Sequence, residues 1–117
     1  MSCPVTFVND KIVISKATSI RTKKCNKYYV FDSEKLVESF TAEKKPIVLR
    51  IKESWKYIVH VYETTRGNIY VSIYDLARKE LLAEIKTLMP LAKILKELTK
   101  IPEHVRKIVE EEIFYEK

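Results

Sequence analysis

The most constraining feature of the sequence is a pair of alternating segments on either side of its only glycine. Residues 57–63 and 69–74 alternate apolar with polar or aromatic side chains, and Gly67 lies between them in residues 65–68. A period of two indicates strands, and a glycine between two such strands is typical of a hairpin turn. The sequence therefore predicts an antiparallel hairpin. The residues expected on its core face are Val59, Val61, Ile69, Val71 and Ile73, with tyrosines on the other face.

Shorter segments predict further strands of a mainly antiparallel sheet. Apolar runs at residues 5–8 and 11–15 flank the Asn-Asp pair at residues 9–10, which suits a hairpin turn. Residues 27–31 are aromatic and β-branched, and residues 46–52 alternate, so each segment predicts a strand.

Residues 76–86 fit either a helix or a strand. Their composition suits a helix capped by Asp75, while their apolar residues also alternate. We favour a third strand of a meander, because Thr87 with Pro90 is typical of a new helix start. A helix that continued through Pro90 would lose a backbone hydrogen bond and clash with the preceding turn.

Three helices are expected. A short internal helix is predicted after a cap at Asp32 or Ser33, ending at about Thr41. Its apolar residues at helical spacing are Leu36, Val37 and Phe40. Residues 88–98 and 102–113 each carry an apolar stripe and predict two C-terminal helices. The expected fold is α+β: a small, mainly antiparallel sheet of hairpins and a meander, one short internal helix and two C-terminal helices.

Length and composition indicate a single α+β domain over residues 1–117. Apolar residues make up 46% and charged residues 32%, which is ordinary for a folded globular chain. No apolar run approaches the ~18–20 residues that span a bilayer. No secretory signal is visible at the start, so we expect a cytoplasmic protein without a membrane association.

The cysteines and the scarce residue types bear on the source of the chain. Cys3 and Cys25 are too few for a disulfide framework and are expected to be free thiols in a reducing compartment. A bridge between them would suit a hyperthermophilic source. The single glycine, the absence of glutamine and the many Lys, Glu, Ile and Val residues are typical of a thermophile.

Most familiar catalytic sites are excluded by composition. With Gly67 alone, the chain has no glycine-rich phosphate loop and no G-x-S-x-G nucleophile turn. His60 is expected to be a half-buried sheet residue rather than a metal ligand, and His104 to be exposed. Asp32 and Asp75 are expected to cap turns or helices; carboxylates of a Mg²⁺-dependent nuclease are the alternative. We therefore expect no enzyme, no metal, no cofactor and no small-molecule ligand.

Two further features each have two interpretations. Trp55 is expected in the core, while an exposed Trp55 beside Lys52 and Lys56 would stack a nucleic-acid base. The glutamates at residues 110–112 form either a solvated helix face or a salt-bridged contact with the basic half of a second copy.

The excess positive charge is confined to the first half of the chain. Residues 1–56 contain 12 Lys/Arg and 6 Asp/Glu, a net of +6, whereas residues 57–117 contain 10 of each. Residues 11–27 include no acidic residue. Cations release counterions from phosphates, and hydroxyl and amide side chains add hydrogen bonds. A charged strand edge that resists aggregation is an equally weighted alternative. The expected nucleic-acid contacts are Lys16, Arg21, Lys23, Lys24, Asn26 and Lys27.

The same region carries a recognisable order of motifs. They are a strand at 12–15, a basic Thr/Lys/Arg loop at 18–27, a Tyr-Tyr strand at 28–31, a Lys-Leu-Val-Glu-like helix at 34–39 and a Lys-Pro-led strand at 45–51. Over residues 11–52 this order resembles the AbrB/SpoVT-type swapped-hairpin regulators and antitoxins of archaea. The resemblance implies an obligate homodimer, with Arg21, Lys23, Lys24 and Lys27 on DNA and residues 57–117 as an extra module.

The sequence thus predicts a small basic nucleic-acid-binding protein, such as a dimeric transcriptional regulator, with its contact surface in residues 16–28. The alternative is a protein-interaction or assembly module that uses the C-terminal helices, for which a viral or plasmid origin is one option. Buried, paired lysines in residues 16–27 would favour this alternative. Clustering of Asp32, Asp75 and His60 in one cleft would favour an enzyme.

Overall fold

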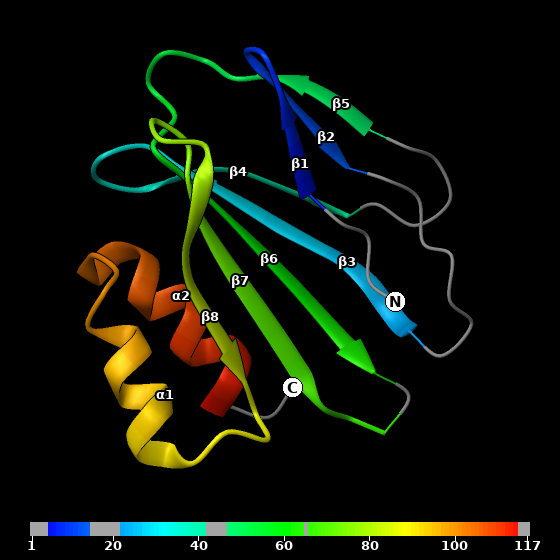
Figure 1. Ribbon diagram of the computed structural model, residues 1–117, viewed down its shortest axis with the longest axis vertical. Coiled ribbons are helices and arrows are strands. Elements are labelled where there is room, and N and C mark those ends of the chain that lie inside the picture. The colour runs from blue at the N-terminus through cyan, green and yellow to red at the C-terminus, as the bar shows by residue number, and fades with distance from the viewer. Residues whose placement is uncertain (1–4, 15–21, 42–46, 65, 115–117) are drawn as a thin grey trace.

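The computed structural model describes residues 5–14, 22–41, 47–64 and 66–114, with the backbone alone for residues 22–26. The elements form three layers (Figure 1). Two helices cover one face of a five-stranded antiparallel sheet, and a three-stranded antiparallel sheet covers part of the other face. The fold is therefore α+β and mainly sheet, as the sequence predicts.

The five-stranded sheet has the order β4-β3-β6-β7-β8, and all its neighbouring strands are antiparallel. Its strands are β3 (Thr22–Phe31), β4 (Leu36–Thr41), β6 (Tyr57–Thr64), β7 (Ile69–Asp75) and β8 (Glu80–Lys86). Because side chains alternate along each strand, every strand between the edges contributes to two hydrophobic layers. The central strand β6 places Val59 in the layer under the helices and Ile58 in the layer under the small sheet.

The β6–β7 hairpin lies where the sequence predicts it. The backbone N–H of Thr64 donates to the carbonyl of Asn68 at 2.9 Å, and Gly67 has a φ of +86°. That positive φ is accessible to glycine at little cost, which explains why the only glycine of the chain lies in this turn. Of the predicted core face, Ile69 is half-buried and the others are buried.

The three-stranded sheet comprises β1 (Val5–Val8), β2 (Lys11–Ile14) and β5 (Ile47–Arg50), in the order β1-β2-β5. The predicted hairpin at residues 9–10 is confirmed, with Asn9 at a φ of +56° that asparagine tolerates. The inner face of this sheet packs Ile12 and Ile14 against Val30 and Ile58 of the larger sheet.

The helices α1 (Leu91–Leu98) and α2 (Glu103–Phe114) cover the opposite face. Their buried side chains, with the residue between the helices, are Ile94, Leu98, Ile101, Val105 and Val109, which pack on the core face of the β6–β7 hairpin. α1 begins after Pro90, whose carbonyl accepts the N–H of Ile94 at 3.1 Å. The favoured strand at residues 76–86 is confirmed from Glu80 onward, and Pro90 separates it from α1 as expected.

The predicted internal helix is wrong, because residues 36–41 form the strand β4. The backbone N–H groups of Glu34 and Lys35 donate to Asp32 Oδ1, at 2.7 and 2.8 Å, so Asp32 caps a tight turn rather than a helix. The chain then reverses and pairs with β3, where Phe40 stacks on Tyr28 with ring centroids 5.2 Å apart. The described residues therefore contain two helices rather than the three expected, both near the C-terminal end. Neither is long and apolar enough to cross a membrane.

Candidate nucleic-acid interface

The six predicted contact residues fall into three groups. Lys16 and Arg21 lie outside the described residues. Lys23, Lys24 and Asn26 lie in β3, where the structure describes only the backbone. The pairing of β3 with β6 places Lys24 opposite Glu63 and Thr22 opposite Thr64. This register brings the basic end of β3 alongside the end of β6 that leads into the hairpin turn. Cys3 lies outside the described residues and Cys25 is described by its backbone alone, so the expected free thiols and the alternative bridge both stay predictions.

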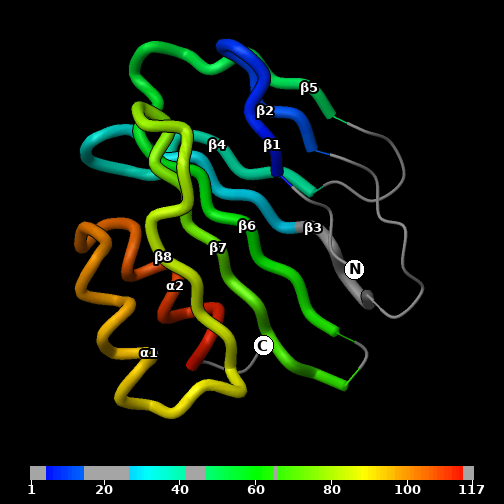
Figure 2. The backbone as a smooth tube through the Cα atoms, in the orientation of Figure 1, coloured from blue at the N-terminus to red at the C-terminus, as the bar shows by residue number. Residues whose placement is uncertain are grey.

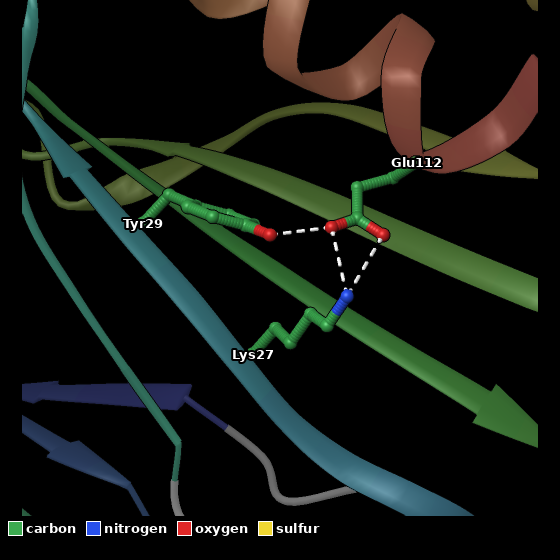
Figure 3. A network of polar contacts seen from close by, with 3 residues as sticks. All are labelled: Lys27, Tyr29 and Glu112. Carbon is green, nitrogen blue, oxygen red and sulfur yellow. Dashed lines mark hydrogen bonds and ion pairs between the residues drawn. The ribbon is translucent and has the colours of Figure 1, made fainter. Parts of the chain in front are cut away.

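Lys27, the sixth predicted contact, points toward the helices (Figure 3). Its Nζ lies 3.3 and 3.4 Å from the two carboxylate oxygens of Glu112 on α2. The hydroxyl of Tyr29 donates to Glu112 Oε2 in the same network. Burial raises the pKa of Tyr29, and its hydrogen bond to the carboxylate raises that pKa further. The arrangement ties α2 to the central sheet across 85 residues of chain.

This network also decides the interpretation of the glutamate run. The side chain of Glu112 is 5% exposed, and its partner is Lys27 of the same chain. The expectations of a wholly solvated face, or of a contact reserved for a second copy, are therefore wrong at this residue. Glu111 is exposed and Glu110 half-buried. Buried glutamate is uncommon without a cation, and the helical position of Glu112 beside Val105 and Val109 explains why it faces the sheet.

The opposite face of the five-stranded sheet carries a column of stacked rings. Tyr28 of β3 stacks between Phe40 of β4 and His60 of β6, with centroid distances of 5.2 and 4.6 Å. His60 contacts Tyr62 at 5.5 Å, and Tyr62 stacks on Tyr70 of β7 at 4.9 Å. The column follows the register, since Tyr28 is opposite His60 and Tyr62 opposite Tyr70. It crosses four strands.

The column ends in a cation. Lys86 of β8 is opposite Tyr70 and places its Nζ 5.5 Å from the Tyr70 ring centroid. Lys86 also lies 3.8 Å from Glu84, and its side chain is 40% exposed. We call Tyr62, Tyr70 and Lys86 the tyrosine–lysine row. These side chains are half-buried, so each keeps part of its surface accessible.

The tyrosine–lysine row lies beyond the cover of the small sheet. The residues that pack under the three-stranded sheet include Tyr28, Ile58 and Tyr74, and neither tyrosine of the row is among them. Figure 2 shows the hairpin end of β6 and β7 extending away from β1, β2 and β5. The row was missing from the predicted contacts, although the alternation of residues 57–63 and 69–74 already placed tyrosines opposite the core face.

His60 is a packing residue. It is 3% exposed, and burial lowers its pKa to about 4. The imidazole is therefore neutral at physiological pH. The expectation of a half-buried sheet residue underestimated its burial. Among the described residues, no group of three or more His, Cys, Asp or Glu side chains is arranged to hold a metal ion.

The two other acidic candidates cap turns. The Asp75 carboxylate accepts the backbone N–H groups of Ala77 and Arg78 at 2.9 and 3.2 Å, as Asp32 does for its own turn. The backbone N–H groups of Glu34 and Lys35 lower the pKa of Asp32. His104 is not exposed as expected: it is half-buried, and its Nε2 lies 3.0 Å from the carbonyl oxygen of Asp32.

Trp55 belongs to the core, which is the favoured of its two interpretations. It is 6% exposed and packs in the layer between the two sheets. Lys52 lies over its ring at 5.6 Å. The indole is therefore buried in the core and contacted by Lys52, and it does not offer a stacking platform for a base.

Comparison of the chain with protein-family models, with curated proteins and with solved structures found no match.

Proposed function

We propose that the protein binds nucleic acid through its phosphate backbone, along the tyrosine–lysine row and the adjoining basic end of β3. The observation that carries the proposal is this adjacency. Two phenols and an ammonium group lie on a part of the sheet that the described three-stranded sheet leaves uncovered, and β3, which pairs with the strand of Tyr62, contains Thr22, Lys23 and Lys24. Hydroxyl, amide and ammonium groups are the usual protein donors to phosphate oxygens.

The stacking geometry favours contacts with phosphates over contacts with bases. The rings of Tyr62 and Tyr70 stack on one another at an interplanar angle of 24°, while His60 and Lys86 lie next along the column. A base could stack only by displacing one of these neighbours. The hydroxyl of Tyr70, at the edge of its ring, needs no such rearrangement. We therefore expect binding with little base preference and with steep salt dependence.

The proposal leaves Lys27 out of the nucleic-acid contacts. Its ammonium group is engaged by Glu112 on the helix side of the sheet, so we assign it to the attachment of α2. The remaining predicted contacts, Lys16, Arg21, Lys23, Lys24 and Asn26, are kept. A homodimeric regulator of the swapped-hairpin type is a more specific form of the same proposal, and the proposed activity is binding without catalysis.

Fluorescence anisotropy tests the proposal with labelled single-stranded DNA, single-stranded RNA and duplex DNA. The variant is Tyr70→Phe/Lys86→Gln, which removes one hydroxyl and one charge from the row. The matched control is Tyr57→Phe/Lys93→Gln, which removes the same groups from the helix-bearing side. We expect affinity to fall about tenfold in the first variant, corresponding to about 1.4 kcal/mol, and less than twofold in the control.

Binding that is absent at low salt for all three nucleic acids would refute the proposal. An equal loss of affinity in the two variants would refute the assigned surface. A third variant, Lys23→Gln/Lys24→Gln, tests the basic end of β3 separately. It should reduce the slope of log K against log salt concentration by about two, because each phosphate contact contributes close to one to that slope.

Two observations favour the alternative, a protein-interaction or assembly module. Lys27, the lysine of residues 16–27 whose side chain the structure describes, is 33% exposed and paired with Glu112. Leu91 and Leu95 of α1 are 60% and 51% exposed, and Leu88 in the preceding turn is 68% exposed, so apolar side chains face outward along this segment. Exposed apolar patches of this kind mark contact surfaces. If this function holds, Leu91→Ser/Leu95→Ser should abolish partner binding or self-association and leave nucleic-acid affinity unchanged.

A further inference from the structure

The two edge strands of the five-stranded sheet, β4 and β8, differ in how their outer backbone groups are protected. At β8, Glu97 of α1 accepts the backbone N–H of Glu84 at 3.2 Å, so one outward donor is already satisfied. Charged residues also recur along β8, at Glu80, Glu84 and Lys86. Charges and covering groups are the devices by which proteins keep edge strands from pairing with other chains.

The β4 edge has fewer of these devices in the described part of the chain: one charged residue, Glu38, and a shift in its register with β3 at Val37. β4 is the last strand in the order of the large sheet, so its outer backbone groups pair with no described strand. Its sequence, Leu-Val-Glu-Ser-Phe-Thr, contains one charge and no proline. All its residues except Phe40 are exposed, including Leu36 at 38% and Val37 at 41%. An open edge of this kind, with a single charge and exposed apolar side chains, is a template for another strand.

We propose that β4 pairs with β4 of a second copy of this chain, in an antiparallel arrangement about a twofold axis. The two five-stranded sheets then become one continuous sheet. The outward backbone donors and acceptors of β4 have the spacing that an extended strand can pair with in place of water, and a second copy offers the same open edge at the same concentration. This inference is separate from the nucleic-acid proposal, because the tyrosine–lysine row lies on β6, β7 and β8, and β4 pairs with residues 27–31 of β3 rather than with its basic end.

Charge and hydrogen-bond parity favour a register centred on Ser39 over one centred on Glu38. In an antiparallel pair, two directly opposite residues either both point their backbone N–H and C=O groups toward the partner strand or both point them away. Two copies of the same strand meet this condition only when one residue lies opposite itself. A centre at Glu38 would oppose two carboxylates, which is unfavourable. A centre at Ser39 sets two hydroxyls opposite one another and brings each Glu38 opposite a Phe40. The Ser39-centred register therefore has no opposed like charges within β4.

The shape of the surface suits this register. An open hollow of about 360 Å³ lies along the end of β4, lined by Lys27, Tyr28, Tyr29, Ser39, Phe40 and Thr41. Pairing centred on Ser39 places Val37 of each copy opposite Thr41 of the other, beside that hollow. Val37, which is largely exposed in the single chain, thereby gains a place to pack at the open end.

Analytical ultracentrifugation tests the proposal across concentrations up to about 1 mM, which detects even weak association. The variants are Ser39→Lys and Ser39→Asp, each of which sets like charges opposite one another at the centre. Ser54→Lys, at an exposed loop position, is the matched control. We expect dimers for the unmodified chain and for Ser54→Lys, and monomers for each Ser39 variant alone. An equal mixture of Ser39→Lys and Ser39→Asp should form dimers again, because the central pair becomes complementary.

The mixing arm distinguishes a lost interface from a misfolded variant, since a chain that failed to fold would not be rescued by its counterpart. Circular dichroism of each variant gives the same check directly. A monomeric unmodified chain at every concentration would overturn the proposal. A dimer that persists in both Ser39 variants would also overturn it, and loss of that dimer in Leu91→Ser/Leu95→Ser would place the contact on α1 instead.

Discussion

Lys27 of β3 and Glu112 of α2 form an ion pair between the central sheet and the last helix, with Lys27 Nζ 3.3 Å from Glu112 Oε2. The carboxylate is nearly inaccessible, whereas the lysine side chain keeps 33% of its surface exposed. A charge buried in this way depends on its partner, because its own hydration has been removed. The pair therefore explains how an acidic helix face can pack against a sheet.

Lys27→Met keeps the aliphatic stem and removes the ammonium group that pairs with Glu112. We expect the free energy of unfolding to fall by about 2 kcal/mol, less than for a fully buried pair because water screens Lys27. Urea unfolding at pH 7 measures this change. In the control, Arg50→Met breaks a pair with Asp10 whose side chains are 81% and 54% exposed, and it should cost less than about 0.5 kcal/mol. Similar losses in the two variants would contradict this account.

His60 predicts a pH dependence of stability. Its folded pKa of about 4 lies below the unfolded value near 6.5, so the unfolded chain binds more protons between these limits. Stability from this residue is therefore complete above about pH 6.5 and is lost as the pH falls toward 4. His60→Phe keeps a ring in the column and removes the titration. The unfolding free energy of the native chain minus that of His60→Phe should fall by up to about 3 kcal/mol over this window. A flat difference would show that His60 titrates normally.

Gly67 predicts a backbone effect without a packing effect. Its φ is +86°, and a Cβ built at this position meets nothing within 4 Å. Gly67→Ala should therefore destabilise the protein by about 1 kcal/mol through strain alone. Gly67→Asn should cost less, because asparagine adopts positive φ more readily. Thermal unfolding of the two variants gives the comparison, and equal stability of Gly67→Ala and the native chain would contradict the strained turn.

Similar substitutions on the two sides of α1 should change the stability of the protein by very different amounts. Ile94 is 5% exposed and packs on the sheet, so Ile94→Ala should cost about 2–4 kcal/mol through lost burial and the remaining cavity. Leu95 is 51% exposed, and Leu95→Ala should change stability by less than about 1 kcal/mol. Urea midpoints measured on both variants decide this, and a large loss at Leu95 would mean that its side chain is covered in solution.

Residues 34–41 show where local pattern and fold diverge. The spacing of Leu36, Val37 and Phe40 suits a helix face, and Asp32 suits a helix cap. Both features are equally compatible with a tight turn followed by a strand, because a six-residue segment is too short for periodicity to separate the two. The pairing of β4 with β3 and the ring contact between Phe40 and Tyr28 decide for the strand.

The sequence by itself determined the elements whose signals are local. The alternation around Gly67, the break at Pro90 and the apolar stripes of the terminal helices depend only on near neighbours, and the structure has a hairpin, a strand end and two helices there. Only the tertiary structure decided which side chains meet. In the sequence, Lys27 is one cation of a basic run. In the structure, α2 brings Glu112 to it from 85 residues along the chain. The tyrosine–lysine row likewise exists only because antiparallel register sets Tyr62, Tyr70 and Lys86 opposite one another. Such contacts follow from the packing of whole layers, which no short stretch of residues encodes.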